Sequence, residues 1–114
     1  MRQEDVKIMK VIDELGTYFL HSYSATALDI TLVKEEELFR VSMRVEGVHI
    51  AQETFQSLQK KLSQPRSPEL EGYYWQLTGE KEDASELRLV AMMCDTIIMN
   101  YTEPVITLEL IRRY

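Results

Sequence analysis

The sequence predicts an α+β domain, a two-layer sandwich in which helices cover one face of a β-sheet. Some segments repeat their apolar residues every three to four positions, which is the period of a helix with one buried side. Other segments alternate apolar and polar residues, which is the period of a strand with one buried face. Elements of these two kinds bury their apolar sides against each other. We expect the 114 residues to form a single domain, 1–114, around a mixed sheet of four to five strands.

The first expected element is an amphipathic helix over about residues 5–23. Asp5 is a suitable N-cap residue for it. Four apolar residues, spaced four, three and four positions apart, share one face of this helix: Ile8, Ile12, Leu15 and Phe19. The helix must therefore bury that face against another element.

Two alternating runs follow, at 27–33 and 39–45, and an acidic stretch around Glu36 joins them. Two such runs with a short charged connection indicate an antiparallel hairpin that has one solvated face. A shorter surface helix is expected over 51–62, because its apolar residues lie on one side and its Gln, Glu and Lys residues on the other.

The second half of the chain begins with a break at 63–68, which contains two prolines. A short helix is expected from Pro68 to the C-cap residue Gly79, because Ser67 can cap its start and Pro68 fits its first turn. The remaining expected elements are a helix from Asp83 or Ser85 toward Cys94 and a hairpin of strands 96–101 and 105–112.

Composition and charge limit the possible partners. The chain has 19 acidic and 13 basic residues and a net charge of −6. A nucleic-acid interface needs a surplus of Lys and Arg, so we expect no nucleic-acid partner. No apolar run approaches the roughly 20 residues that span a bilayer, so we expect no membrane partner. A single cysteine, Cys94, cannot form an internal disulfide, which favours a cytoplasmic location.

Few residues are candidates for metal or phosphate chemistry. His21, His49 and Cys94 are the imidazole and thiol ligands, and no two of them have the spacing of a known metal site. The four glycines are scattered along the chain and form no phosphate-binding loop. We therefore expect neither a metal nor a cofactor.

Three stretches of the chain resemble the motifs of one enzyme family. They are residues 13–23, residues 39–50, and residues 86–90 together with Asp95 and the closing hairpin. In order and spacing they are similar to the magnesium-binding helix, the Asp-x-Gly-x-Gly segment and the Gly-Leu-Gly-Leu-Val helix start of the GHKL (Bergerat-type) ATPase domain. That domain occurs in sensor histidine kinases and anti-sigma-factor serine kinases. The resemblance covers nearly the whole chain and implies a Bergerat-like fold.

Most of the family's nucleotide-binding residues are replaced at the positions that the resemblance assigns to them. Glu14 matches the family's glutamate, but Tyr18 stands where an asparagine holds magnesium. Val45 replaces the aspartate that accepts the adenine amino group. Gly47 keeps the first glycine of the second motif, whereas His49 replaces the second glycine.

The third motif loses both of its glycines, because Glu86 and Arg88 stand in their places. A glutamate at a helix start repels the phosphate oxygens that such a helix start would otherwise bind. We therefore interpret the seven positions as a vestigial nucleotide site. The resemblance then implies a pseudo-ATPase, for which we expect no catalytic residues.

The favoured hypothesis is a non-catalytic regulatory or protein-interaction domain. Its candidate partner-binding residues are Tyr73, Tyr74 and Trp75, although such an aromatic run more often fixes a helix to the core. The expected partner is another protein involved in signalling or regulation, or a second copy of the chain.

Three alternatives stay open from the sequence. The first is a divergent serine kinase that still binds ATP and uses Glu14 as a general base. The second is a small-ligand binder whose remodelled cavity is lined by Tyr18, Val45 and His49. The third is a generic α+β domain whose likeness to the ATPase family is a coincidence.

Overall fold

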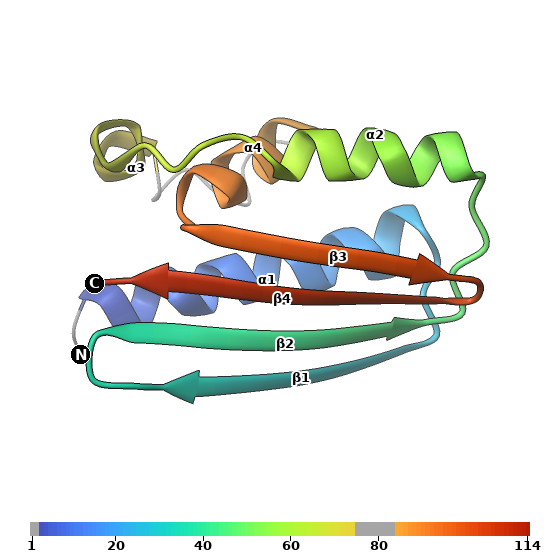
Figure 1. The fold of residues 1–114 in the computed structure, drawn as a ribbon, viewed down its shortest axis with the longest axis horizontal. Coiled ribbons are helices and arrows are strands. Elements are labelled where there is room, and N and C mark those ends of the chain that lie inside the picture. The colour runs from blue at the N-terminus through green and yellow to red at the C-terminus, as the bar shows by residue number, and fades with distance from the viewer. Residues whose placement is uncertain (1–2, 75–83) are drawn as a thin grey trace.

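A computed structural model of the chain describes residues 3–74 and 84–114 (Figure 1). Helices and strands follow one another in the predicted order. Their bounds are α1 (Gln3–Ser22), β1 (Ala27–Lys34), β2 (Leu38–Glu46), α2 (Gln52–Leu62), α3 (Pro68–Tyr74), α4 (Ala84–Met92), β3 (Thr96–Thr102) and β4 (Val105–Arg113). The prediction of an α+β sandwich is confirmed. Residues 75–79, at the end of the helix predicted to run from Pro68 to Gly79, lie outside the described residues.

The four strands form one sheet in the order β1-β2-β4-β3, and every pairing in it is antiparallel. The sheet therefore has the lower of the two expected strand numbers, and it is not the mixed sheet that the sequence predicts. The reason is the position of β4. The chain returns from β2 through three helices to β3, which runs parallel to β2, but β4 lies between these two strands and is antiparallel to both.

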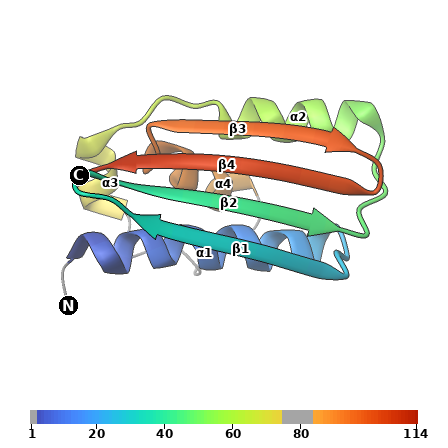
Figure 2. The ribbon, with the colours of Figure 1, turned by 60° about the horizontal axis from the view of Figure 1, so that its bottom comes forward.

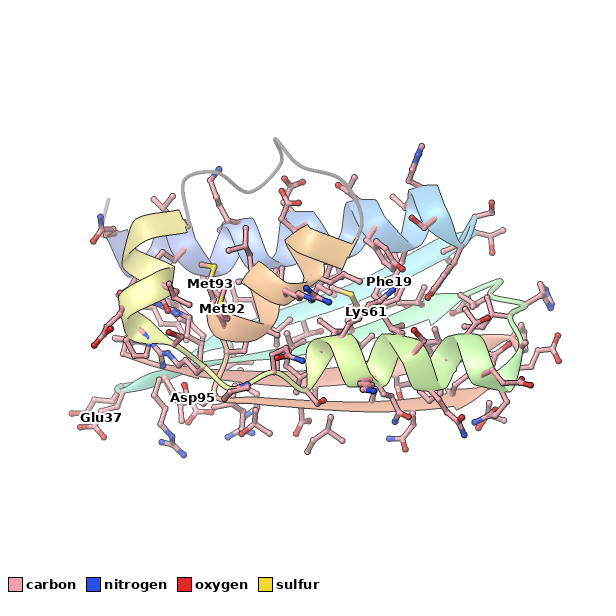
Figure 3. All side chains as sticks on the ribbon, turned by 90° about the horizontal axis from the view of Figure 1, so that it is seen from above. Phe19, Glu37, Lys61, Met92, Met93 and Asp95 are labelled. Atoms are coloured by element: carbon pink, nitrogen blue, oxygen red, sulfur yellow. The ribbon has the colours of Figure 1, made fainter. Side chains whose placement is uncertain are left out.

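The four helices of the described residues lie on one face of the sheet, and none of them lies on the other face, which we call the helix-free face (Figure 2). Alternation along the two central strands produces this arrangement. Val41 and Leu110, which are opposite each other in the register, point into the core, as do Val45 and Ile106. Seen from above, α4 lies between α1 and α2 (Figure 3). The core is the layer between these helices and the sheet.

Within residues 3–74 and 84–114, no helix combines the length and the apolar character that crossing a bilayer requires.

Candidate functional site

The two predicted nucleotide-site residues of α1 lie in a packed environment. Glu14 is buried on α1. The Tyr18 ring contacts Phe19 at 5.8 Å and Tyr23 at 5.3 Å between ring centroids, and its hydroxyl donates to the Tyr23 hydroxyl at 3.4 Å. Burial and this hydrogen bond raise the pKa of Tyr23, so Tyr23 stays a neutral phenol at physiological pH. Tyr18 is therefore part of an aromatic cluster that fixes the end of α1.

The three positions that follow in the predicted nucleotide site do not converge on one space. Val45 is fully buried in β2. Gly47 has a φ of +82°, and a Cβ atom built on it would lie 2.4 Å from the Thr26 Oγ1 atom. His49 is exposed, with its Nδ1 atom 2.8 Å from a Glu103 carboxylate oxygen. The conformation of the backbone thus explains the glycine without a nucleotide.

The remaining predicted residues are described only in part. Arg88 is exposed on α4. The side chains of Glu86, Tyr73 and Tyr74, and the whole of Trp75, lie outside the described residues. The aromatic partner-binding patch therefore stays a prediction from the sequence. The hollows described below are lined by other residues.

A buried ion cluster lies at the end of the sheet where β4 finishes. Arg112 is 1% exposed and binds Glu71, which is 4% exposed, through two hydrogen bonds of 2.7 Å. Arg112 also donates to a Glu4 oxygen at 2.9 Å and to the Met93 carbonyl at 2.7 Å. The Lys7 ammonium donates to Glu71 at 2.9 Å. These contacts join the start of α1, α3, the end of α4 and β4.

Arg66, in the segment between α2 and α3, extends this cluster. Its guanidinium lies 2.7 Å from Asp95 and 3.6 Å from Glu71, and it donates to the Arg113 carbonyl at 2.8 Å. The whole cluster contains three cations and three carboxylates: Lys7, Arg66, Arg112, Glu4, Glu71 and Asp95. Because the positive and negative charges of the cluster balance, we interpret it as a structural feature that holds these elements together rather than as a ligand site.

Acid is expected to destabilise the fold through Glu71. Burial by itself raises the pKa of this carboxyl, but the hydrogen bonds and charges of Arg112 and Lys7 outweigh burial, so the pKa lies below its ordinary value of 4.5. A lowered folded-state pKa contributes stability above the unfolded-state pKa, and this contribution disappears as the pH falls through the folded-state value. Urea denaturation between pH 7 and pH 3 should show a loss of stability below about pH 5 that is smaller in Glu71→Gln. Equal losses in the two proteins would contradict this assignment.

The single thiol lies in the core. Cys94 is 3% exposed, and burial raises its pKa to about 12. A thiol in this state is protonated and a poor nucleophile. In the described part of the chain, no three His, Cys, Asp or Glu side chains are grouped so that they could hold a metal ion.

The helix-free face of the sheet carries polar and charged side chains of both signs. Its middle contains a hollow of about 440 Å³, whose lining includes Arg44, Asn100 and Glu109. Asp29 and Arg44 are opposite each other in the β1–β2 register. A polar face turned to solvent is usual for an antiparallel sheet. This face therefore needs no ligand to account for its composition.

The free edge of β3 differs from the rest of the surface. Thr96–Thr102 contains no charged residue, no proline and no glycine. Among the described strands it pairs with β4 alone, so one row of its backbone N–H and C=O groups has no strand partner. The opposite edge strand, β1, carries Asp29 and Lys34, the kind of charges by which natural sheets protect their edges. β3 lacks this protection.

Helix α2 packs over β3 on the helix-covered face of the sheet: it lies above β3 in Figure 1 and behind β3 in Figure 2, where it extends past the free edge of the strand. The Phe55 ring holds it there by contact with Tyr101, at 5.3 Å between ring centroids. The Tyr101 hydroxyl also accepts a hydrogen bond from the Ile50 amide, at 3.1 Å, just before α2 begins. The helix therefore covers β3 next to the free edge of the strand.

Two adjacent hollows lie between α2, the segment that follows it, and β3. One has a volume of about 140 Å³ and is lined by Gln59, Leu62, Ser63, Ile97 and Met99. The other, of about 280 Å³, shares Leu62, Ser63 and Ile97 and extends toward the start of β3. We call the free edge of β3 together with these two hollows the β3–α2 groove. It is the candidate functional site.

No family model matches the chain, and no curated protein or solved structure matches it either. The likeness to the GHKL ATPase domain therefore stays a prediction from the sequence.

Sequence reasoning missed both the groove and the ion cluster. The groove had one visible signal, which is the lack of any charge in Thr96–Thr102 in a chain that is 28% charged. The cluster also had one. Arg112 continues the alternation of Ile106, Leu108 and Leu110, so its register places it on the buried face.

Proposed function

We propose that this domain is a non-catalytic protein-interaction module. It takes an extended segment of another protein as a fifth strand along the free edge of β3, beneath α2. The observation that supports this proposal is the uncharged edge strand with the groove beside it. In this mode of recognition, backbone hydrogen bonds supply affinity, and pockets for alternate side chains supply specificity.

The position of α2 favours a single added segment over a second copy of the domain at this edge. Paired strands lie about 4.8 Å apart, whereas packed helices need 8–10 Å between their axes. Two copies joined through antiparallel β3 edges would bring their α2 helices closer together than packed helices allow, because α2 lies over β3 and extends past its free edge (Figure 2). A lone strand carries no such helix. A homodimer would therefore use another surface.

A peptide-display selection tests the proposal. Random heptapeptides flanked by Gly-Ser linkers are selected on the native domain, and the selected peptides are synthesised for calorimetry. Gln59 is exposed on α2 and lines the smaller hollow, so Gln59→Trp should fill the groove while the domain stays folded. We expect this variant to weaken binding at least tenfold, a change of about 1.4 kcal/mol.

Gln3→Trp is the matched control, because Gln3 is equally exposed but begins α1, which lies along the opposite edge of the sheet (Figure 2). It should bind the selected peptides as the native domain does. Circular dichroism checks that both variants are folded. Failure to select any peptide, or binding that Gln59→Trp leaves unchanged, would show that the groove is not the site.

Magnesium and ATP together are expected to leave the melting temperature unchanged. The position that would hold magnesium is Tyr18, which packs in the aromatic cluster, and the adenine position is Val45, which is fully buried. A ligand present at 100 times its dissociation constant would stabilise the fold by about 2.7 kcal/mol. Thermal denaturation with and without millimolar Mg-ATP makes the comparison. A rise of several degrees would favour the kinase alternative.

A further inference from the structure

We infer that the segment bound by the β3–α2 groove is uncharged and carries aliphatic side chains two positions apart. This inference rests on the proposed function and specifies the chemistry of its partner. Three features of the groove support it: the charges around it, the size and lining of its hollows, and the alternation that a strand imposes on whatever pairs with it.

The walls of the groove carry no net charge for a charged segment to meet. β3 has no charged residue. On α2 and its C-cap residue, the uncharged side chains of Gln52, Gln56, Gln59 and Ser63 are spaced four, three and four positions apart, and of these Gln59 and Ser63 line the smaller hollow. The Asp95 carboxylate at the start of β3 is already paired with Arg66 at 2.7 Å. A charged side chain placed here would lose hydration without gaining a partner.

The smaller hollow has the size and the lining for one aliphatic side chain. Its volume is about 140 Å³, and Leu62, Ile97 and Met99 supply its apolar surface. Ile97 and Met99 belong to the set of β3 residues that faces the helices, since they pair with the buried Leu110 and Leu108. In an added strand, every second side chain would enter the same layer, below α2.

The second hollow determines the spacing of the aliphatic residues in the bound segment. It shares three lining residues with the first and continues toward the start of β3, with a volume of about 280 Å³. Side chains two positions apart in a strand lie about 6.6–6.8 Å from each other on one face. Adjacent hollows at this scale therefore accept residues i and i+2 of the segment, the larger side chain lying toward Thr96. The intervening side chain points to the helix-free face, beside the exposed Ile98 and Asn100.

The sequences of the selected heptapeptides test this inference. We expect aliphatic residues at i and i+2 with no Lys, Arg, Asp or Glu between them. Replacing either aliphatic residue by Lys in a synthesised peptide should weaken binding to the native domain at least tenfold. Hydrogen exchange should slow at β3 amides when the peptide is bound, because the added strand covers the free edge.

The outcomes separate this inference from the proposed function. Selected peptides that are charged, or whose apolar residues are spaced three and four apart as in a helix, would overturn the inference. If Gln59→Trp still weakened the binding of such peptides, the groove would remain the binding site. Peptides that bind Gln59→Trp and the native domain equally would overturn both.

Discussion

Arg112→Ala is expected to lower the free energy of unfolding by about 3–5 kcal/mol, which is the range for breaking a buried ion pair by removing one partner. Arg112 is 1% exposed, and its guanidinium is the common partner of Glu71, Glu4 and the Met93 carbonyl. Its loss would leave the Glu71 carboxylate buried with Lys7 as its one close hydrogen-bond donor among the described residues. Urea or guanidinium denaturation at pH 7 measures the change.

Arg40→Ala is the matched control, since it removes the same side chain from the helix-free face of the neighbouring strand. Arg40 is partly exposed and lies 3.3 Å from Glu35, and an exposed pair of this kind contributes about 0–1 kcal/mol. The double variant Arg112→Met, Glu71→Leu removes both partners of the buried Arg112–Glu71 pair and leaves Lys7 with Glu4, 3.8 Å away, so it should recover part of the stability that Arg112→Ala loses. If Arg112→Ala lost no more stability than Arg40→Ala, the ion cluster would not hold these elements together as we infer.

The ion cluster also shows where sequence reasoning ends. Periods of 3.6 and 2 residues, together with capping residues, located the helices and strands of the described residues, because these signals depend on neighbours a few positions away. The prediction of a mixed sheet was wrong. The order of the strands depends on which strand of each hairpin lies at the centre of the sheet, and the two central strands, β2 and β4, are far apart in the sequence. A partnership between Arg112 and Glu71, 41 positions apart, leaves no periodic signal.

The candidate site was even less accessible from the sequence. A groove needs two elements side by side, and Gln59 of α2 lines the same hollow as Met99 of β3 only because α2 packs over β3. Neither residue has a side chain that suggests chemistry, so a search for ligands, nucleophiles and phosphate loops passes over both. The uncharged composition of β3 is visible in the sequence, but it indicates a binding edge only once β3 is known to be an edge strand.

Gly47→Ala is expected to destabilise the fold by about 2–5 kcal/mol, and two separable causes contribute. The first is the φ of +82°, a left-handed conformation that costs a residue with a Cβ atom roughly 1–2 kcal/mol. The second is the collision of the new Cβ atom with Thr26, whose Oγ1 atom would lie 2.4 Å away; overpacking of this kind costs about 1–3 kcal/mol. Thr26 is β-branched and cannot turn aside freely.

The double variant Thr26→Ala, Gly47→Ala separates these causes. Thr26→Ala removes the Oγ1 and Cγ2 atoms that the new Cβ atom would meet, and by itself it loses only a long hydrogen bond of 3.4 Å to the Glu46 carbonyl. In its background Gly47→Ala should cost about 1–2 kcal/mol, because the backbone conformation still opposes it and the contact that remains, with the Cβ atom of residue 26 at 3.1 Å, is tight but not a collision. Denaturation of the four proteins gives the coupling. If Gly47→Ala proved harmless in the native background, the structural account of this glycine would fail. The role of Gly47 in binding a ligand, which the resemblance to the ATPase family implies, would then be the better explanation.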